Sequence, residues 1–324
     1  MPDPLVSVAI ITYNQAEFIH ETLEGTINQD YDNLEVVVAD DSSSDGTADI
    51  IRDYSDSYPQ RVVPVLSDKN VGITENSNRA LKVAQGKYIA FQGGDDILLP
   101  GKIKKQVAWM EENDDRVLSG HDVEFFDSES GRILAVWSDT KPLTTGNGPA
   151  KVIRNGVPFA ATSVMVRKIS IPSYGFDSRV PVTSDWKLWI DCLAGGGEFG
   201  FINEILAKYR RYRKNISNEV QIMAQSRLIT LSIIESSQPE FIQECTIQRS
   251  RAYYDLGIDL MKKSEYKIAR KLFWNAIKSS GFQDIKIPLA FIATLLPSNW
   301  SQSFLVNRTV PRKPADYLRN FLRE

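Results

Sequence analysis

Two apolar segments in the first hundred residues each run directly into a pair of aspartates. They are Val36–Asp41, which reads VVVADD, and Tyr88–Asp96, which reads YIAFQGGDD. A continuous apolar run is typical of a strand buried on both faces of a parallel sheet, and open sheets of this kind bind ligands beyond the carboxyl ends of their strands. Both acidic pairs are therefore expected at one edge of one sheet. Four carboxylates there would repel one another, so the pattern indicates a divalent metal that carries a phosphate-containing ligand.

The elements that must hold these aspartates alternate between strand and helix. A first strand is expected over 5–12, and apolar residues at helical spacing follow over 16–28. The same alternation continues to residue 91, which predicts an α/β fold with a mostly parallel, doubly wound sheet and right-handed crossovers. The other expected elements of this part are strands at 34–39, 62–66 and 88–91 and helices at 48–56 and 75–84.

The pattern changes after residue 117, where strands and turns dominate up to about residue 217. From 218 onward the chain is mostly helical, and residues 251–278 predict a helical hairpin. An amphipathic helical subdomain is favoured there over a single tetratricopeptide-like unit, because one unit is not a repeat array. The expected elements of the middle part are strands at 117–126, 132–137, 164–166 and 204–212 and a helix at 186–194, which ends at three consecutive glycines.

Composition and charge narrow the class of protein. The two cysteines, Cys192 and Cys245, form no framework and indicate a reducing compartment, while two histidines are too few for a multi-histidine zinc site. The start of the chain has no basic region of a signal peptide, and no segment reaches the length of a spanning helix, so a cytoplasmic location is expected. Residues 1–215 hold 23 Lys and Arg against 31 Asp and Glu, which argues against nucleic acid as a partner.

Four motifs in this order resemble the nucleotide-binding half of family 2 glycosyltransferases. They are Val6–Asn14 (VSVAIITYN), Glu35–Thr47 (EVVVADDSSSDGT), Asn70–Leu81 (NVGITENSNRAL) and Tyr88–Pro100 (YIAFQGGDDILLP). The resemblance covers about residues 5–217 and implies the GT-A fold, a Rossmann-like sheet flanked by helices. It also implies a GT-A domain at 1–217, divided into a nucleotide-binding half at 1–116 and an acceptor half at 117–217. The helical C-terminal region at 218–324 lies outside the resemblance and is expected from its helical pattern.

The resemblance assigns the nucleotide to the loops that follow the strands. Asp41 would accept a hydrogen bond from a uracil ring N–H or from ribose, with the opening of the serine-rich turn as its alternative role. Gly94 would allow the ligand to approach the backbone closely. For Asn14 a turn at the end of the strand, and for Arg79 an exposed helix surface, are the competing interpretations. The other nucleotide-binding candidates are Thr12, Tyr13, Asn14, Asn76 and Arg79.

The metal candidate is Asp95, with Asp96 as a second candidate. The family motif usually reads Asp-x-Asp, and Gly93 stands where its first aspartate would be. One carboxylate is therefore missing, and water or diphosphate oxygens would complete the shell of Mg²⁺ or Mn²⁺. The candidates for diphosphate binding are Arg210 and Arg213, in a basic stretch where Tyr212 replaces a histidine that relatives often carry. A solvated run of charges is the alternative for this stretch.

The catalytic candidate is Asp185, in a segment that resembles the second acidic motif of the family. That motif commonly reads Glu-Asp at the start of a helix, and here Ser184 takes the place of the glutamate. The resemblance makes Asp185 the general base that deprotonates an acceptor hydroxyl. A helix cap is its alternative role. Asp191 is the nearest rival, but it lies nearly two turns further along the helix.

These features together predict an inverting glycosyltransferase that uses a nucleotide-diphosphate sugar, UDP- or dTDP-linked, for bacterial cell-surface polysaccharide or glycan synthesis. A nucleotidyltransferase would normally carry a glycine-rich, basic loop after the first strand, and Thr12–Phe18 has neither glycine nor a basic residue. A non-catalytic nucleotide-sugar-binding relative is the other alternative, because of Gly93 and Ser184.

The C-terminal tail suggests a lipid-linked acceptor. Residues 262–324 hold 12 Lys and Arg against 4 Asp and Glu, and they include the apolar run Ile285–Leu296. This pattern predicts peripheral contact with the inner face of a membrane. The alternative is that the apolar residues of the run pack on the catalytic domain, and Pro288 disfavours a long helix there.

Overall fold

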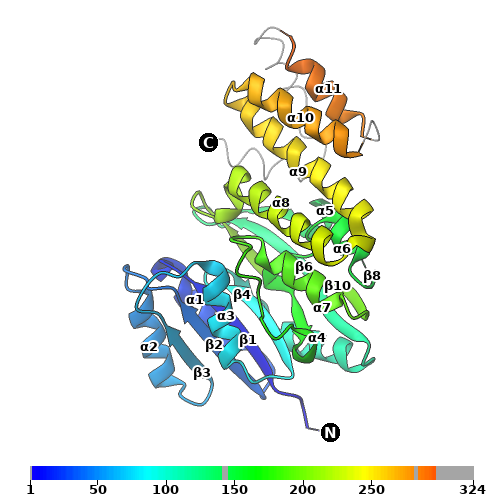
Figure 1. Ribbon diagram of the computed structural model, residues 1–324. Coiled ribbons are helices and arrows are strands. Elements are labelled where there is room, and N and C mark those ends of the chain that lie inside the picture. The colour runs from blue at the N-terminus through cyan, green and yellow to red at the C-terminus, as the bar shows by residue number, and fades with distance from the viewer. Residues whose placement is uncertain (1, 141–144, 281–283, 297–324) are drawn as a thin grey trace. The chain divides into compact units, whose positions relative to one another are not determined.

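The computed structural model of the chain describes residues 2–140, 145–280 and 284–296. These residues form two compact units. Unit 1 comprises Met1–Pro149 and Val157–Tyr212, and unit 2 comprises Ala150–Gly156 and the residues from Arg213 onward. Figure 1 shows the order of the elements along the chain. The basic positions Arg308, Arg312, Lys313, Arg319 and Arg323 of the predicted tail lie outside the described residues.

Unit 1 is built on one mixed sheet in the order β3-β2-β1-β4-β9-β6-β10-β5, with β7 paired to β6 and β8 paired to β10. Pairs β3–β2, β2–β1, β1–β4 and β6–β10 are parallel, whereas the short β9 is antiparallel to both of its neighbours. The strands are β1 Val6–Thr12, β2 Leu34–Asp40, β3 Val62–Leu66, β4 Tyr88–Gly93, β5 Ile97–Leu98, β6 Arg116–Asp127, β7 Ile133–Val136, β8 Gly146–Asn147, β9 Met165–Arg167 and β10 Glu198–Arg211.

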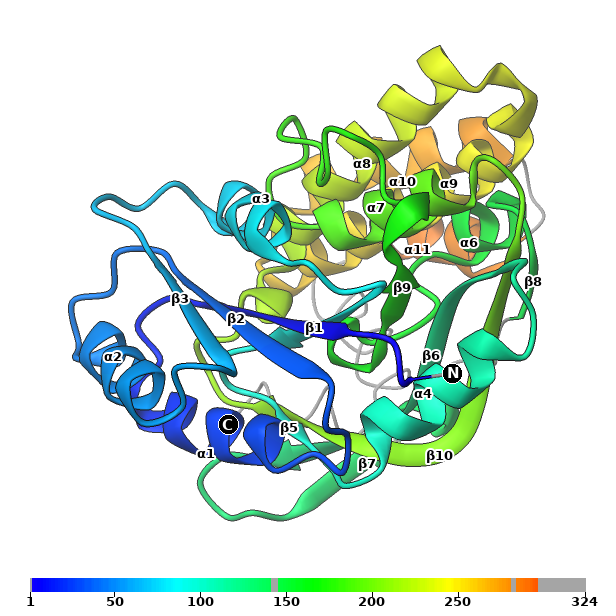
Figure 2. The ribbon, with the colours of Figure 1, turned by 90° about the horizontal axis from the view of Figure 1, so that it is seen from below.

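Helices cover both faces of the first half of this sheet, as the alternating pattern predicts. Helices α1 and α2 lie on one face of β1–β3, and α3 lies on the other (Figure 2). The crossover changes face because β4 pairs with β1 on the side opposite β2. The helices of unit 1 are α1 Ala16–Ile27, α2 Thr47–Ser57, α3 Ile73–Val83, α4 Lys102–Glu111, α5 Trp137–Thr140 and α7 Ser184–Leu193, with 3₁₀ turns at Ala161–Ser163 and Lys168–Ser170.

The apolar runs that predicted central strands are buried as expected. In β1 every residue except Ile11 is buried, and the residues of β2 from Val36 to Asp40 are also buried. The predicted α/β class and the mostly parallel arrangement are therefore confirmed. The sequence assigned no element to 97–116, where β5 and α4 lie, and it placed the start of β10 six residues too late. The chain enters β10 through Gly196 and Gly197, whose φ values of +90° and +98° suit glycine.

Unit 2 is helical, and its centre is the predicted hairpin. Helices α9 and α10 are joined by a short turn in which Ser264 has a φ of +63°. Phe273 of α10 packs with Leu260 and Met261 of α9, and Gly257 lies directly under the Phe273 ring. The helices of this unit are α6 Ala150–Asn155, α8 Val220–Ser237, α9 Ile242–Lys262, α10 Tyr266–Ser280 and α11 Lys286–Ala293, with 3₁₀ turns at Ile216–Asn218 and Pro239–Phe241.

Candidate active site

The loop after β1 is held by the serine-rich turn after β2. Asn14 has a φ of +50°; its backbone N–H donates to Ser43 Oγ at 2.7 Å, and its Oδ1 accepts from the Ser44 N–H at 2.8 Å. The structure therefore places Asn14 in a turn. Thr12 is buried, whereas Tyr13 is 49% exposed and presents its ring at the surface of the loop.

The next two backbone N–H groups of this loop are also occupied by side chains. Gln15 N–H donates to Thr47 Oγ1 at 3.0 Å, and Ala16 N–H donates to an Asp45 carboxylate oxygen at 3.0 Å. Burial acts to raise the pKa of Asp45, but hydrogen bonds from Thr47 and from the Ala16 N–H hold that pKa below its ordinary value. A carboxylate thus occupies the N-terminal end of α1, where a phosphate would otherwise find free donors.

Asp41 lies 3% exposed at the end of β2 and binds the loop that starts α3. Its carboxylate accepts from Val71 N–H at 2.7 Å and from Gly72 N–H at 2.9 Å. Gly72 has a φ of +87°, which suits glycine. The neighbouring Asp40 accepts from the N–H of Ser43, as expected of a residue that opens the turn.

Asn76 and Arg79 tie α3 to the ends of β2 and β3. Asn76 has no exposed surface, and its amide donates to the Ala39 carbonyl at 2.8 Å and accepts from Arg79 at 3.0 Å. The Arg79 guanidinium also donates to the Leu66 carbonyl at 2.6 Å. Asn76 therefore has no surface with which to touch a ligand in this structure, and it acts on the site through Arg79.

The two glycines at the end of β4, Gly93 and Gly94, have no room for a Cβ atom. Gly94 N–H donates to the Ile11 carbonyl at 2.9 Å, and a Cβ on Gly94 would lie 2.6 Å from the Thr12 side chain. A Cβ on Gly93 would lie 2.7 Å from an Asp95 carboxylate oxygen. The Gly-Gly sequence thus lets this loop lie against the end of β1.

Asp95 and Asp96 differ in what surrounds them. Asp96 is buried and its carboxylate accepts from Arg210 N–H at 3.1 Å, while Asp95 is half-buried beside Tyr212 and Gln15. Burial raises the pKa of both carboxyls, and the charge of Asp95 raises that of Asp96 further. Hydrogen bonds from Tyr212 and Gln15 oppose the rise at Asp95. Of the two, Asp95 is the carboxylate more accessible to a ligand.

Arg210 is part of the support of this loop. It is buried between the rings of Phe18 and Phe126, and it donates to the Asp95 carbonyl at 2.8 Å and forms an ion pair with Glu21. The structure thus places Arg210 against the backbone of Asp95. The alternative interpretation, that Arg210 belongs to a solvated run of charges, is wrong because its side chain is buried. Aromatic stacking partners make this burial favourable for a guanidinium. Arg213, the other candidate, is exposed in unit 2.

The residues around Asp95 fit a metal that is shared with a ligand. Within 2–140, 145–280 and 284–296, no three His, Cys, Asp or Glu side chains gather as a metal site. Asp95 supplies one carboxylate, and Mg²⁺ and Mn²⁺ commonly take one or two carboxylates together with substrate phosphates and water. The donors present fit such a shared shell and do not fit a site made by the protein alone.

Asp185 lies half-buried in the first turn of α7, and its carboxylate accepts from the Trp186 N–H at 2.7 Å. The preceding residue, Ser184, is buried, and its hydroxyl oxygen is hydrogen-bonded to Thr74 Oγ1 at 2.9 Å. Thr74 belongs to α3 and also donates to the Val180 carbonyl at 2.7 Å. The start of α3, which Asp41 holds, is therefore joined to the start of α7, which carries Asp185.

This connection gives a first testable expectation. Thr74→Val removes the hydroxyl that fixes the start of α7, so we expect kcat to fall about tenfold, equivalent to about 1.4 kcal/mol, with little change in nucleotide affinity. Thr74→Ser keeps the hydroxyl and should restore the rate. Steady-state kinetics with nucleotide calorimetry measures both quantities, and an equal loss in the valine and serine variants would contradict the positioning role.

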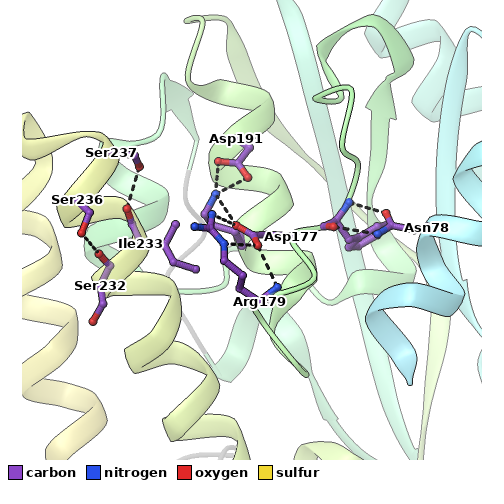
Figure 3. Close-up of polar contacts among 10 residues, drawn as sticks. Asn78, Asp177, Arg179, Asp191, Ser232, Ile233, Ser236 and Ser237 are labelled. Atoms are coloured by element: carbon purple, nitrogen blue, oxygen red, sulfur yellow. Dashed lines mark hydrogen bonds and ion pairs between the residues drawn. The ribbon is translucent and has the colours of Figure 1, made fainter. Parts of the chain in front are cut away.

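Asp191, the rival of Asp185, is occupied in a buried ion pair. Lys187 Nζ lies 2.6 Å from both Asp191 oxygens and 4.0 Å from Asp177, and Asp177 in turn binds Arg179 at 2.6 Å (Figure 3). Burial raises the pKa of Asp191, while the Lys187 ammonium opposes that rise. Breaking a pair of this kind is strongly destabilising, so Asp191 has a structural role.

Comparison with known proteins identifies the family. Residues 7–168 match the family described as "Glycosyl transferase family 2". The chain belongs to glycosyl transferase family 2. The predicted resemblance and the assignment as a transferase are thereby confirmed.

Three relatives show how far the similarity extends. "Uncharacterized glycosyltransferase MJ1057" of Methanocaldococcus jannaschii is 32% identical over 212 residues, 65% of this chain and 72% of that protein. Rv1520 of Mycobacterium tuberculosis is 32% identical over 65% of this chain, but only 60% of its own length is covered. The Escherichia coli "UDP-Glc:alpha-D-GlcNAc-diphosphoundecaprenol beta-1,3-glucosyltransferase WfaP" is 28% identical over 66% of this chain and 80% of that protein.

Two solved structures of nucleotide-sugar complexes share the fold of this chain. Staphylococcus aureus TarS in complex with UDP-GlcNAc has a TM-score of 0.65 at 15% identity, over 98% of this chain and 91% of that chain. The mannosyltransferase PcManGT of Pyrobaculum calidifontis, in complex with GDP-Man and Mn²⁺, has a TM-score of 0.61 at 17% identity, over 99% of this chain and 83% of that chain. These similarities confirm the predicted GT-A fold.

Sequence reasoning did not single out Gln15 or Thr74, two residues that organise this site. Gln15 accepts from Thr12 Oγ1 at 2.9 Å and donates to the Tyr212 hydroxyl at 3.4 Å, so it connects the ends of β1 and β10. Both are ordinary polar residues near helix starts, and only the tertiary contacts reveal their positions. Across the described ranges, none of the helices has the length and apolarity to span a bilayer.

Proposed function

We propose that this family 2 glycosyltransferase is a metal-dependent, inverting enzyme that moves a sugar from a UDP- or dTDP-linked donor to an acceptor hydroxyl. The observation that carries the proposal is the chain of contacts along one edge of the sheet. Gly94 N–H donates to the Ile11 carbonyl of β1, and Asp41 N–H donates to the Thr12 carbonyl. Thr74 joins α3 to Ser184 at the start of α7. From these contacts we infer that Asp95 and Asp185 serve one site at this edge, where open α/β sheets bind their ligands.

The donor would lie across the ends of β1, β2 and β4. Tyr13 offers an exposed ring to a base, and Asp41 fixes the loop before α3 by accepting from the Val71 and Gly72 N–H groups. Gly94 is buried, and its N–H bond to the Ile11 carbonyl holds the loop of Asp95 against the end of β1. A divalent ion held between Asp95 and the diphosphate would neutralise charge on the leaving group.

The transfer would proceed in one displacement. Asp185 takes the proton of the acceptor hydroxyl, and the acceptor oxygen forms its bond to the anomeric carbon as the bond from that carbon to the diphosphate oxygen breaks. A single displacement inverts the configuration at this carbon. Because Asp191 is bound to Lys187, we assign this role to Asp185, the other carboxylate of α7.

The nucleotidyltransferase alternative is disfavoured by the loop after β1. Such an enzyme needs backbone donors there for phosphate, whereas the N–H groups of Asn14, Gln15 and Ala16 donate to Ser43, Thr47 and Asp45. The non-catalytic alternative predicts nucleotide-sugar binding without turnover.

The acceptor class follows from a relative. WfaP is named for a diphosphoundecaprenol-linked acceptor, so a lipid-linked glycan of a cell-surface pathway is the acceptor that we propose here. Thermal shift against UDP-, GDP-, dTDP- and CMP-sugars with Mn²⁺ tests the donor. We expect a UDP- or dTDP-sugar to raise the melting temperature most, and a larger shift with a GDP- or CMP-sugar would contradict the donor class.

A further inference from the structure

The C-terminal helices of unit 2 carry a ridge of exposed apolar side chains. Helix α11 has one buried face and one exposed face. The buried face packs against α9 and α10 and consists of Ile287, Ala290 and Ala293. The opposite face carries apolar residues at helical spacing, continued by the turn that follows the helix. We call this set the α11 ridge: Ile285 (66% exposed), Leu289 (41%), Ile292 (51%) and Leu296 (44%).

The structure thereby divides the apolar run that the sequence left undecided. Ile287 and Phe291 pack inside unit 2, whereas Leu289, Ile292 and Leu295 are exposed. Pro288 lies in the first turn of α11, where a backbone N–H has no partner within the helix, so it does not break the helix. Four large aliphatic side chains on one short helix and the residues that flank it are more than scattered surface residues, and they indicate an interaction surface.

Helix α10 places positive charge beside this ridge. Lys267, Lys271, Trp274 and Lys278 recur at helical spacing on its exposed face, and we call them the α10 stripe. The ring of Trp274 lies 5.8 Å from that of Phe291 on α11, so the stripe adjoins the second helix (Figure 1). Lys278 Nζ lies 5.6 Å from the centre of the Trp274 ring.

The charge balance of this part selects one kind of partner. Residues 266–296 contain five basic side chains and one acidic side chain, Asp284. An aliphatic ridge bordered by a tryptophan and lysines matches the composition of protein surfaces that insert into the interface of an anionic membrane. An apolar protein partner would have no need for this excess of positive charge.

We propose that the α11 ridge and the α10 stripe dock the chain on an anionic lipid bilayer. The ridge inserts among the acyl chains near the headgroups, and the lysines of the stripe contact lipid phosphates. This inference deepens the proposed function, on which it rests for its purpose, because a lipid-linked acceptor is presented at such a surface.

Flotation of the full-length protein with vesicles tests the proposal. We expect binding to phosphatidylcholine vesicles that contain phosphatidylglycerol, weak binding to pure phosphatidylcholine vesicles, and release as salt increases. The ridge variant Leu289→Ser/Ile292→Ser should abolish binding, and the stripe variant Lys271→Glu/Lys278→Glu should weaken it at least about 25-fold, at about fivefold for each lysine removed.

Matched controls use exposed residues elsewhere. Ile222→Ser/Ile229→Ser removes two exposed isoleucines from α8, and Lys104→Glu/Lys105→Glu reverses two exposed charges of α4. Both should retain vesicle binding. All four variants should keep nucleotide binding, so a failure of this inference and a failure of the proposed function are separable.

Three results would overturn the proposal. One is wild-type protein that stays unbound on anionic vesicles at low salt. Another is equal binding by wild type and the ridge variant. If the wild type instead elutes as a dimer that the ridge variant dissociates, the ridge is an interface between two copies and the lipid assignment is wrong.

Discussion

Asp185→Asn should lower kcat by about 10²–10⁴-fold while nucleotide affinity stays nearly unchanged. The substitution keeps the shape of the side chain and an oxygen for the Trp186 N–H, so the start of α7 should remain intact. What it removes is the basic oxygen that takes the acceptor proton. Steady-state kinetics with the true acceptor and calorimetry with UDP measure the two quantities.

Two controls separate this effect from a structural one. Asp49→Asn removes another aspartate from a first helical turn, that of α2, and should leave kcat unchanged. Asp191→Asn breaks the buried pair with Lys187 and should cost stability, by about 3 kcal/mol or more, with little loss of turnover per folded molecule. If Asp185→Asn keeps wild-type turnover, the base is assigned to the wrong residue.

Asp95→Ala should lower kcat/KM by about 10²–10³-fold and remove the dependence of UDP binding on metal, because metal stabilisation of the leaving group is worth several kcal/mol. Asp96 is buried and its carboxylate accepts from Arg210 N–H, so Asp95 is the carboxylate that we expect to meet the ion. Calorimetry should detect no Mn²⁺ binding by the protein alone and clear binding once UDP is present.

A parallel substitution identifies which aspartate matters. Asp96→Asn preserves an oxygen for the Arg210 N–H, so its activity should lie much closer to wild type than that of Asp95→Ala. Equal affinity for UDP in EDTA and in Mn²⁺ would contradict the shared metal site.

The fold could be predicted because its central strands are buried on both faces. The apolar runs of β1, β2 and β4 have a length and composition that leave few alternatives, and the turns between them carry glycine and serine. Helix α4 was missed because it begins at Lys102, a residue type expected at the surface, whereas here it is buried and its ammonium donates to Gln106 Oε1 at 2.8 Å. Burial lowers the pKa of this lysine to about 7, an environment that no sequence pattern signals.

The candidate site could be predicted in part. The positions of Asp41, Asp95 and Asp185 at strand ends and at a helix start follow from the order of elements, but the partners of each side chain do not. Arg210 was predicted as a phosphate ligand because it lies in a basic run, and the structure places it under Asp95 between two rings. Arg210 is buried because Phe18 and Phe126, which are far apart in the sequence, lie on either side of its guanidinium. The spacing of residues in the sequence does not predict contacts between such distant positions.

Nucleotide release from donor sugars tests the proposed chemistry most directly. The protein is incubated with UDP-, GDP-, dTDP- or CMP-sugars and a lipid extract of bacterial membranes, in Mn²⁺ or in EDTA, and released nucleotide is measured by chromatography. The proposal predicts release of UDP or dTDP that requires both the extract and the metal and that falls at least about 10²-fold in Asp185→Asn. Release that is equal in EDTA, or equal in the Asp185→Asn variant, would contradict it.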